Sequence, residues 1–156
     1  MLRTALDLFV SREPLLSKLL QDVPETRWAE QPAGLPNHAA WTMGHLCLAH
    51  NVLLSLLGDK PRCPAEWKQH MDMGTQPVSD RNLYPTCEAL WTAYREGQAA
   101  VTAAVRAADP EMMSQTMPIE SFRVFFPTIG HATLYLLCTH EATHHGQLQT
   151  WKRALH

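Results

Sequence analysis

Long hydrophobic runs, paired cysteines and an excess of charge of either sign are all missing from this sequence of 156 residues. The apolar runs near the start are short and interrupted, and none is long enough to span a bilayer, so we expect no membrane association. Charged residues make up 18% and the net charge is -2, which argues against nucleic-acid binding and against disorder. The expected partners are therefore small molecules or a second copy of the chain.

The four cysteines are scattered, without the Cys-x-x-Cys spacing of a zinc or redox site. Two of them fall inside predicted core helices. This usage favours reduced thiols in a cytoplasmic protein over a disulfide framework. The length fits one domain over residues 1–156 with a hydrophobic core of its own.

Hydrophobic periodicity predicts four long helices and almost no strand. Apolar residues recur at intervals of three and four over residues 2–22, 38–57, 85–108 and from 128 nearly to the C-terminus. Pro14 predicts a kink or a break in the first helix, and Asn37 is placed to cap the second. Residues 58–84 form a long crossover with a short helix around 65–73, and residues 121–126 could be extended. The expected fold class is all-α, a four-helix bundle with a long crossover.

Histidine is over-represented, with nine residues. Six of them form two groups, which are His38, His45 and His50 on the second predicted helix and His140, His144 and His145 on the last. His140 and His144 are four residues apart and turn through about 400° of helix, so both imidazoles face one spot. Their helix face is otherwise apolar, and two buried imidazoles are either neutral metal ligands or hydrogen-bonded core histidines. His145 lies about 100° further round and is expected to be exposed or beside the ligands.

A metal site needs a third ligand, and the second helix offers three candidates. His45 and His50 are five residues apart and diverge by about 140°, so only one of them can reach the site. His38 lies seven residues before His45 and differs from it by only about 20° in direction. Spacing alone leaves the choice among the three open.

The segment His140–His144 also spells His-Glu-x-x-His, the zinc-protease motif in which the glutamate is the general base. A zincin-type metallopeptidase needs a further ligand downstream, but the extended motif asks for glycine and histidine where this chain has Gln147 and Thr150. Glu141 and His144 have the spacing of a di-iron site as well, but the second Glu-x-x-His that such a site requires is missing. Both interpretations are therefore disfavoured.

Two motifs resemble those of the DinB/YfiT superfamily of metal-dependent bundle proteins. One is the segment Asn37–Leu46, which ends in Gly-His-Leu, and the other is the His-x-x-x-His-His-Gly-Gln run that begins at His140. The resemblance extends over the whole chain in element order. It implies a divalent metal ion, with zinc, nickel, iron and manganese as candidates, held by three histidines. Carried over to this sequence, these ligands are His45, His140 and His144.

Members of that superfamily include transferases that use low-molecular-weight thiols and also hydrolases. The resemblance therefore implies a metal-dependent thiol transferase or hydrolase acting on a small molecule, with a low-molecular-weight thiol as partner. A homodimer is a separate expectation, because bundles with apolar helix faces often pair. Glu141 is the candidate catalytic residue, as a base or as an orienting group, and an exposed pairing with His145 is the alternative. A bundle that binds a metal or ligand without catalysis is the competing function.

Overall fold

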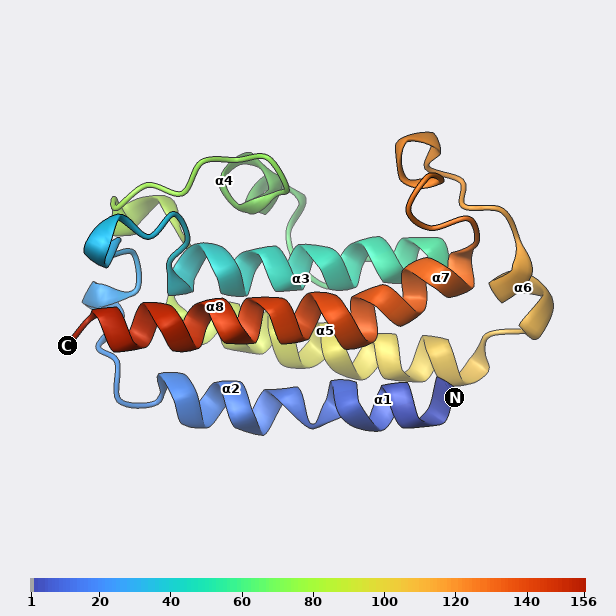
Figure 1. Cartoon of the computed structure of the whole chain (residues 1–156), viewed down its shortest axis with the longest axis horizontal. Coiled ribbons are helices and arrows are strands. Elements are labelled where there is room, and N and C mark those ends of the chain that lie inside the picture. Colours follow the sequence, from blue (N-terminus) through green and yellow to red (C-terminus); the bar gives the residue numbers. More distant parts are fainter. Residues whose placement is uncertain (1) are drawn as a thin grey trace.

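Four long helical rods lie side by side in the computed structural model, which describes residues 2–156 (Figure 1). The first rod is α1 (Leu2–Val10) followed by α2 (Arg12–Leu20), the second is α3 (Ala39–Leu56), the third is α5 (Cys87–Ala107), and the fourth is α7 (Ile129–Leu134), a π-helical segment (Tyr135–His140) and α8 (Glu141–Ala154). Strand structure within residues 2–156 is limited to one isolated bridge between Thr116 and Thr128. The predicted all-α class is confirmed.

The connections between the rods contain several short helices. They are 3-10 turns at Glu25–Arg27, Pro32–Gly34, Ala65–Trp67, Arg81–Leu83 and Glu120–Phe122, together with α4 (Lys68–Met71) and α6 (Pro110–Ser114). The crossover carries α4 along the outside of α3, and the connection after α6 stands off one end of the bundle (Figure 1). Residues 121–126 are not extended as predicted, because the N–H groups of Phe125 and Phe126 fold back onto the carbonyl of Phe122.

The first rod breaks at Ser11, which confirms the kink or break expected from Pro14. Proline has no N–H to donate to the carbonyl four residues earlier, so the helix restarts with Pro14 in the first turn of α2, where no donor is needed. The cap predicted for the second rod is wrong. His38 caps α3 in place of Asn37, because its Nδ1 accepts the N–H of Trp41 at 3.2 Å.

Two hydrophobic clusters fill the interior. One joins α2, α3, the first half of α5 and α8 and includes Leu46 and Trp151, whereas the other joins α1 with the later parts of α3 and α5 and includes Phe9 and Leu137. Burying each large apolar side chain contributes about 1.5–3 kcal/mol, so the clusters hold the rods together. No helix among residues 2–156 has both the length and the hydrophobicity to cross a lipid bilayer.

Candidate metal centre

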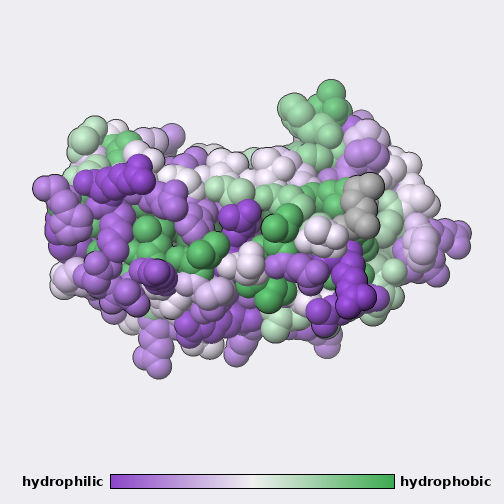
Figure 2. Space-filling model, turned by 60° about the horizontal axis from the view of Figure 1, so that its bottom comes forward, coloured by the Kyte–Doolittle hydropathy of each residue, from purple (hydrophilic) through white to green (hydrophobic). Residues whose placement is uncertain are grey.

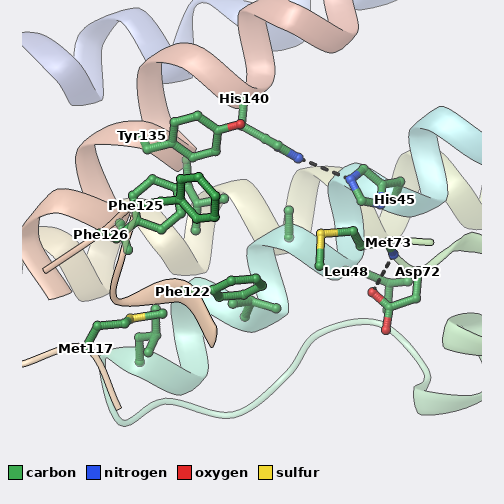
Figure 3. A pocket seen from close by; sticks show the side chains of 15 residues that line it. His45, Leu48, Asp72, Met73, Met117, Phe122, Phe125, Phe126, Tyr135 and His140 are labelled. Atoms are coloured by element: carbon green, nitrogen blue, oxygen red, sulfur yellow. Dashed lines mark hydrogen bonds between the residues drawn. The ribbon is translucent and has the colours of Figure 1, made fainter. Parts of the chain in front are cut away.

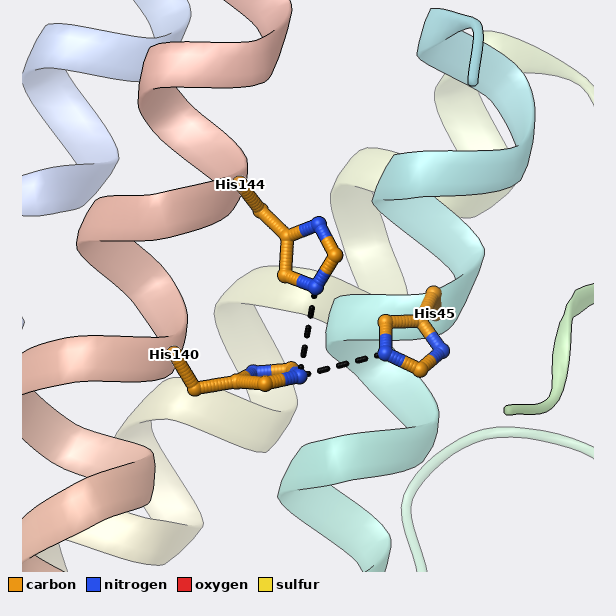
Figure 4. A group of neighbouring side chains, drawn as sticks. All are labelled: His45, His140 and His144. Atoms are coloured by element: carbon orange, nitrogen blue, oxygen red, sulfur yellow. Dashed lines mark hydrogen bonds between the residues drawn. The ribbon is translucent and has the colours of Figure 1, made fainter. Parts of the chain in front are cut away.

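Three imidazoles converge between the second and fourth rods (Figure 4). His45 comes from α3, His140 ends the π-helical segment, and His144 lies one turn further on in α8. The Nε2 atom of His140 is 3.1 Å from Nε2 of His45 and 3.2 Å from Nε2 of His144. Ligand nitrogens of all three lie within 4.8 Å of one another. These residues, named the histidine cluster below, are the three that the family resemblance selected.

Two of the three nitrogen separations in the cluster match those around a first-row divalent ion. Metal–nitrogen bonds of about 2.0–2.1 Å place two ligand nitrogens about 2.9 Å apart at a right angle and about 3.4 Å apart at the tetrahedral angle. The separations of 3.1 and 3.2 Å fall within this range. Three imidazoles would also leave at least one coordination position for water or substrate, as in catalytic metal sites.

Hydrogen bonds on the outer side of the rings set which nitrogen carries the proton. The Nδ1–H of His45 donates to the backbone carbonyl of Met71 at 3.1 Å, and the Nδ1–H of His144 donates to Oε1 of Gln147 at 2.8 Å. The Gln147 oxygen also accepts the amide of Asn37 at 3.2 Å, which holds it in place. With the proton on Nδ1, the inward Nε2 has a free lone pair, which is the form that binds a metal.

The glycine before His45 makes room for one of these partners. A Cβ atom on Gly44 would lie 2.0 Å from Sδ of Met71, so only glycine lets α4 pack this closely against α3. The other side of the His45 ring stacks on Trp41, with centroids 4.7 Å apart and planes 9° apart. The indole Nε1–H of Trp41 donates to Oγ1 of Thr75 at 2.8 Å. His45 is therefore oriented by a carbonyl at its Nδ1 and by an aromatic face.

Burial keeps the cluster uncharged at neutral pH. Desolvation, reinforced by the neighbouring His144 and His45 imidazoles, lowers the pKa of His140 to about 3. Desolvation also lowers the pKa of His144 to about 4. The pKa of His45 is lowered for the same reason, against the opposite effects of the Met71 carbonyl and the Asp72 carboxylate. Protons therefore compete weakly with a metal ion for these nitrogens.

The other histidines of the two groups do not join the cluster. His38 is fully buried as the cap of α3, and its Nε2 lies 3.1 Å from the carbonyl of Val78. His145 is only 8% exposed, so the alternative of an exposed side chain is wrong for it. His50 faces α5 and the last rod from a different side of α3, in a separate polar group.

Glu141 lies in that separate group, buried at 1% exposure. Its Oε1 accepts the Nε2–H of His50 at 2.8 Å, and its Oε2 accepts the hydroxyl of Tyr94 at 3.1 Å. A Cβ on Gly97 would come within 2.8 Å of Nδ1 of His50, so this glycine gives the imidazole its space against α5. The exposed pairing of Glu141 with His145 is therefore wrong.

Sequence reasoning did not foresee the contact between His50 and Glu141, although a signal for it was present. His50 is turned by about 140° from His45 on one helix, and Glu141 is turned by about 100° from His140 on the other. If one member of each pair faces the cluster, the other members turn toward a common side of the bundle. The same rotation that was used to exclude His50 as a ligand thus predicts its partner.

An apolar pocket of about 560 Å³ opens beside His45 and His140 (Figure 3). Its wall is formed by one face of α3, by the connection around residues 117–126, and by the π-helical segment. Phe122, Phe126 and Tyr135 stand along it in Figure 3. Sequence patterns do not indicate this pocket, since its aromatic residues belong to a connection without periodicity.

Comparison with known proteins identifies a family. The model of the DinB superfamily matches residues 9–148, a span that contains the whole histidine cluster. Searches of the curated proteins and of the solved structures returned no match. The superfamily that the two histidine motifs suggested is therefore confirmed.

Proposed function

The chain belongs to the DinB superfamily, and from this premise we propose that it is an enzyme that holds a divalent metal ion in the histidine cluster and catalyses thiol transfer or hydrolysis on a small molecule. The observation that carries the proposal is the convergence of three Nε2 atoms from two rods. Zinc, nickel, iron and manganese all accept imidazole ligands and are the candidate ions.

Each part of the site has a distinct task. A bound divalent ion would supply a Lewis acid that lowers the pKa of a water molecule or a thiol. The Met71 carbonyl and the Gln147 amide hold the proton on the outer nitrogen of their histidines, which keeps the inner nitrogens available. The wall of the pocket beside His45 and His140 is largely apolar, so a substrate seated in it would displace water from one side of the cluster and strengthen electrostatic interactions there.

For Glu141 we propose an orienting role. Both carboxylate oxygens are engaged, one by His50 and the other by Tyr94, and the side chain is buried. A general base needs access to the proton that it removes. Because Glu141 directly follows His140 in the chain, its anchoring fixes the backbone that carries this ligand.

Metal analysis of purified and reconstituted protein tests the ligand set. His45→Ala and His144→Ala are expected to lose the ion, because each removes one of three nitrogens. His50→Ala is the matched control, since this buried histidine of α3 lies outside the cluster and its variant should retain the ion. Circular dichroism would establish that each variant is folded. Retention in His45→Ala with loss in His50→Ala would refute the assignment, and failure of reconstituted wild type to bind any ion would refute the site.

Activity is tested on protein with full metal occupancy. Thiol consumption would be measured against a panel of electrophiles, and hydrolysis against panels of esters and amides. Turnover that disappears in His144→Ala and persists in an exposed-surface variant would support the proposal. Absence of turnover in both assays at full metal occupancy would favour the competing function, a bundle that binds a metal or ligand without catalysis.

A further inference from the structure

We infer that the ligand of the histidine cluster is a neutral amphiphile, whose polar head reaches His45 and His140 while an alkyl or aromatic tail fills the adjoining pocket. This inference rests on the proposed metal site and names the class of molecule that the site accepts. The two histidines are the polar end of a wall that is otherwise almost wholly apolar (Figure 3). A molecule that binds the metal from this side must therefore pass its remaining atoms along that wall.

The size and chemistry of the pocket define the tail. A volume of about 560 Å³ falls within the range of about 300–1,000 Å³ that is usual for small-molecule sites. Leu48, Val52 and Leu56 form the side contributed by α3. Among the residues that the structure describes, no lysine or arginine lines the pocket. The shape suits a chain or ring of drug-like size without an anionic group.

The one charged residue of the wall disfavours a negative tail. Asp72 lies at the pocket and close enough to His45 to act on its pKa. A carboxylate or phosphate on the tail would meet this like charge and would find no cation to replace its hydration. Small thiols that carry several charged groups are therefore a poor match for this pocket, and an uncharged tail is a good one.

The residues at the mouth of the pocket also favour an apolar ligand tail. Phe125 lines it and is 72% exposed, and the adjacent Val124 is 79% exposed. Figure 2 shows a hydrophobic protrusion at the end of the bundle where this connection stands off. Beside it, Phe126 packs on Tyr135 with ring centroids 4.8 Å apart. Exposed apolar groups gathered at a pocket mark a binding surface, because an apolar tail would remove them from water.

A series of hydroxamic acids with different alkyl chains tests whether the pocket prefers an apolar tail, because all members share the same metal-binding group. Butano-, hexano- and octanohydroxamic acid would be titrated into zinc-reconstituted protein by calorimetry. Affinity is expected to rise about fourfold for each added methylene that is buried. Suberic acid monohydroxamate has the length of the octano compound but ends in a carboxylate, and it is expected to lose most of that increase.

Two variants with the same substitution locate the tail. Ala49→Phe places a ring into the pocket from α3 and is expected to remove the dependence on chain length. Ala103→Phe makes the same change at an exposed position of α5 and is expected to leave that dependence intact. Phe125→Ser serves as a second pocket variant that barely disturbs folding, because its side chain is largely exposed, and it should weaken the octano compound more than the butano compound.

The outcomes separate this inference from the proposed metal site. Absence of zinc binding would refute the site, whereas zinc binding with hydroxamates of all lengths within about twofold of each other would refute the apolar tail alone. Equal affinity for the octano compound and its carboxylate analogue would also refute it. Butanol, hexanol and octanol, followed by NMR shifts in residues 122–126 without added metal, give a second readout of the same pocket. A dimer that dissociates in Ala49→Phe would overturn the inference in favour of a second copy as the occupant.

Discussion

Alanine in place of Gly44 is expected to disturb the proposed metal site without replacing any residue of the histidine cluster. The new Cβ would lie 2.0 Å from Sδ of Met71, whereas ordinary contact begins at 3.4 Å, so the sulfur has to move by about 1.4 Å. Met71 is 1% exposed, and side chains in a protein interior are closely packed by their neighbours. The displacement therefore reaches the Met71 backbone, whose carbonyl holds Nδ1 of His45 at 3.1 Å.

The size of the effect follows from two opposing contributions. Overpacking a buried site costs about 1–3 kcal/mol, while alanine stabilises a helix interior relative to glycine by about 1 kcal/mol. We therefore expect Gly44→Ala to lower the free energy of unfolding by up to about 2 kcal/mol. Loss of the outer partner of a metal-binding histidine weakens metal affinity about 10- to 100-fold, and the variant should show a loss of this order.

Urea unfolding of metal-free protein would give the stability, and competition with a chelator would give the metal affinity. Gly146→Ala is the matched control, because Gly146 lies inside α8 and a Cβ there meets nothing within 4 Å. It should stabilise the fold by up to about 1 kcal/mol and leave metal affinity unchanged. The double variant Gly44→Ala/Met71→Ala removes the clash, so its cost should fall below the sum of the single costs by about 1 kcal/mol.

Equal effects of the Gly44 and Gly146 substitutions on stability and on metal affinity would refute this reasoning. Both sites are glycines within helices, and they differ in the room available for a Cβ atom. Additive costs in the double variant would refute it as well, because they would show that the methyl group added at position 44 and the Met71 side chain do not meet.

Three further changes probe the supporting groups. Glu141→Ala leaves the His50 N–H and the Tyr94 hydroxyl without their buried acceptor, and a loss of about 2–6 kcal/mol is expected by urea unfolding, because each unpaired buried donor costs about 1–3 kcal/mol; a loss below about 1 kcal/mol would contradict the network. Gln147→Leu removes the acceptor of His144 Nδ1–H and should weaken metal binding about 10- to 100-fold in a chelator assay, whereas unchanged affinity would contradict its orienting role. The cluster pKa values of about 3 and about 4 lie below the unfolded value of about 6.5, so the unfolded chain binds protons first as the pH falls. The urea midpoint of metal-free protein should therefore decrease from pH 7 toward pH 4, and a flat midpoint would contradict these shifts.

The rods and two of the three cluster histidines could be predicted from local periodicity. The i, i+4 spacing of His140 and His144 fixes their relative direction within one helix, so no tertiary information is needed. The break at Ser11 follows equally locally from Pro14. These predictions depend on geometry within about two helical turns, and the structure confirms them.

The position of His45, the third member of the cluster, and the pocket depend on contacts between distant segments. Periodicity left three candidates on α3, because it gives the rotation of His45 relative to its neighbours but not the rotation of α3 relative to α8. Gly44 would settle the matter, but its role becomes visible only when Met71 is placed against it. The aromatic residues of the 117–126 connection show no hydrophobic periodicity. Their arrangement around a pocket therefore depends only on tertiary contacts and could not be predicted from local sequence.

The buried hydrogen-bonded group around Glu141 helps to fix the rotation of α8 relative to α3. A carboxylate fully enclosed by hydrogen-bond donors is costly to leave unpaired, so α8 is held at the rotation that keeps Glu141 with His50 and Tyr94. Neighbouring residues of a helix differ by about 100°, so this rotation also turns His140 about a quarter turn away from Glu141, toward His45. One residue later or earlier, the same helix would lose both sets of contacts at once. Single buried hydrogen bonds contribute only about 0.5–1.5 kcal/mol each, so losing the His50 bond alone leaves Tyr94 and the apolar clusters to hold the last rod; together these contacts favour the face of the rod that carries the histidine cluster.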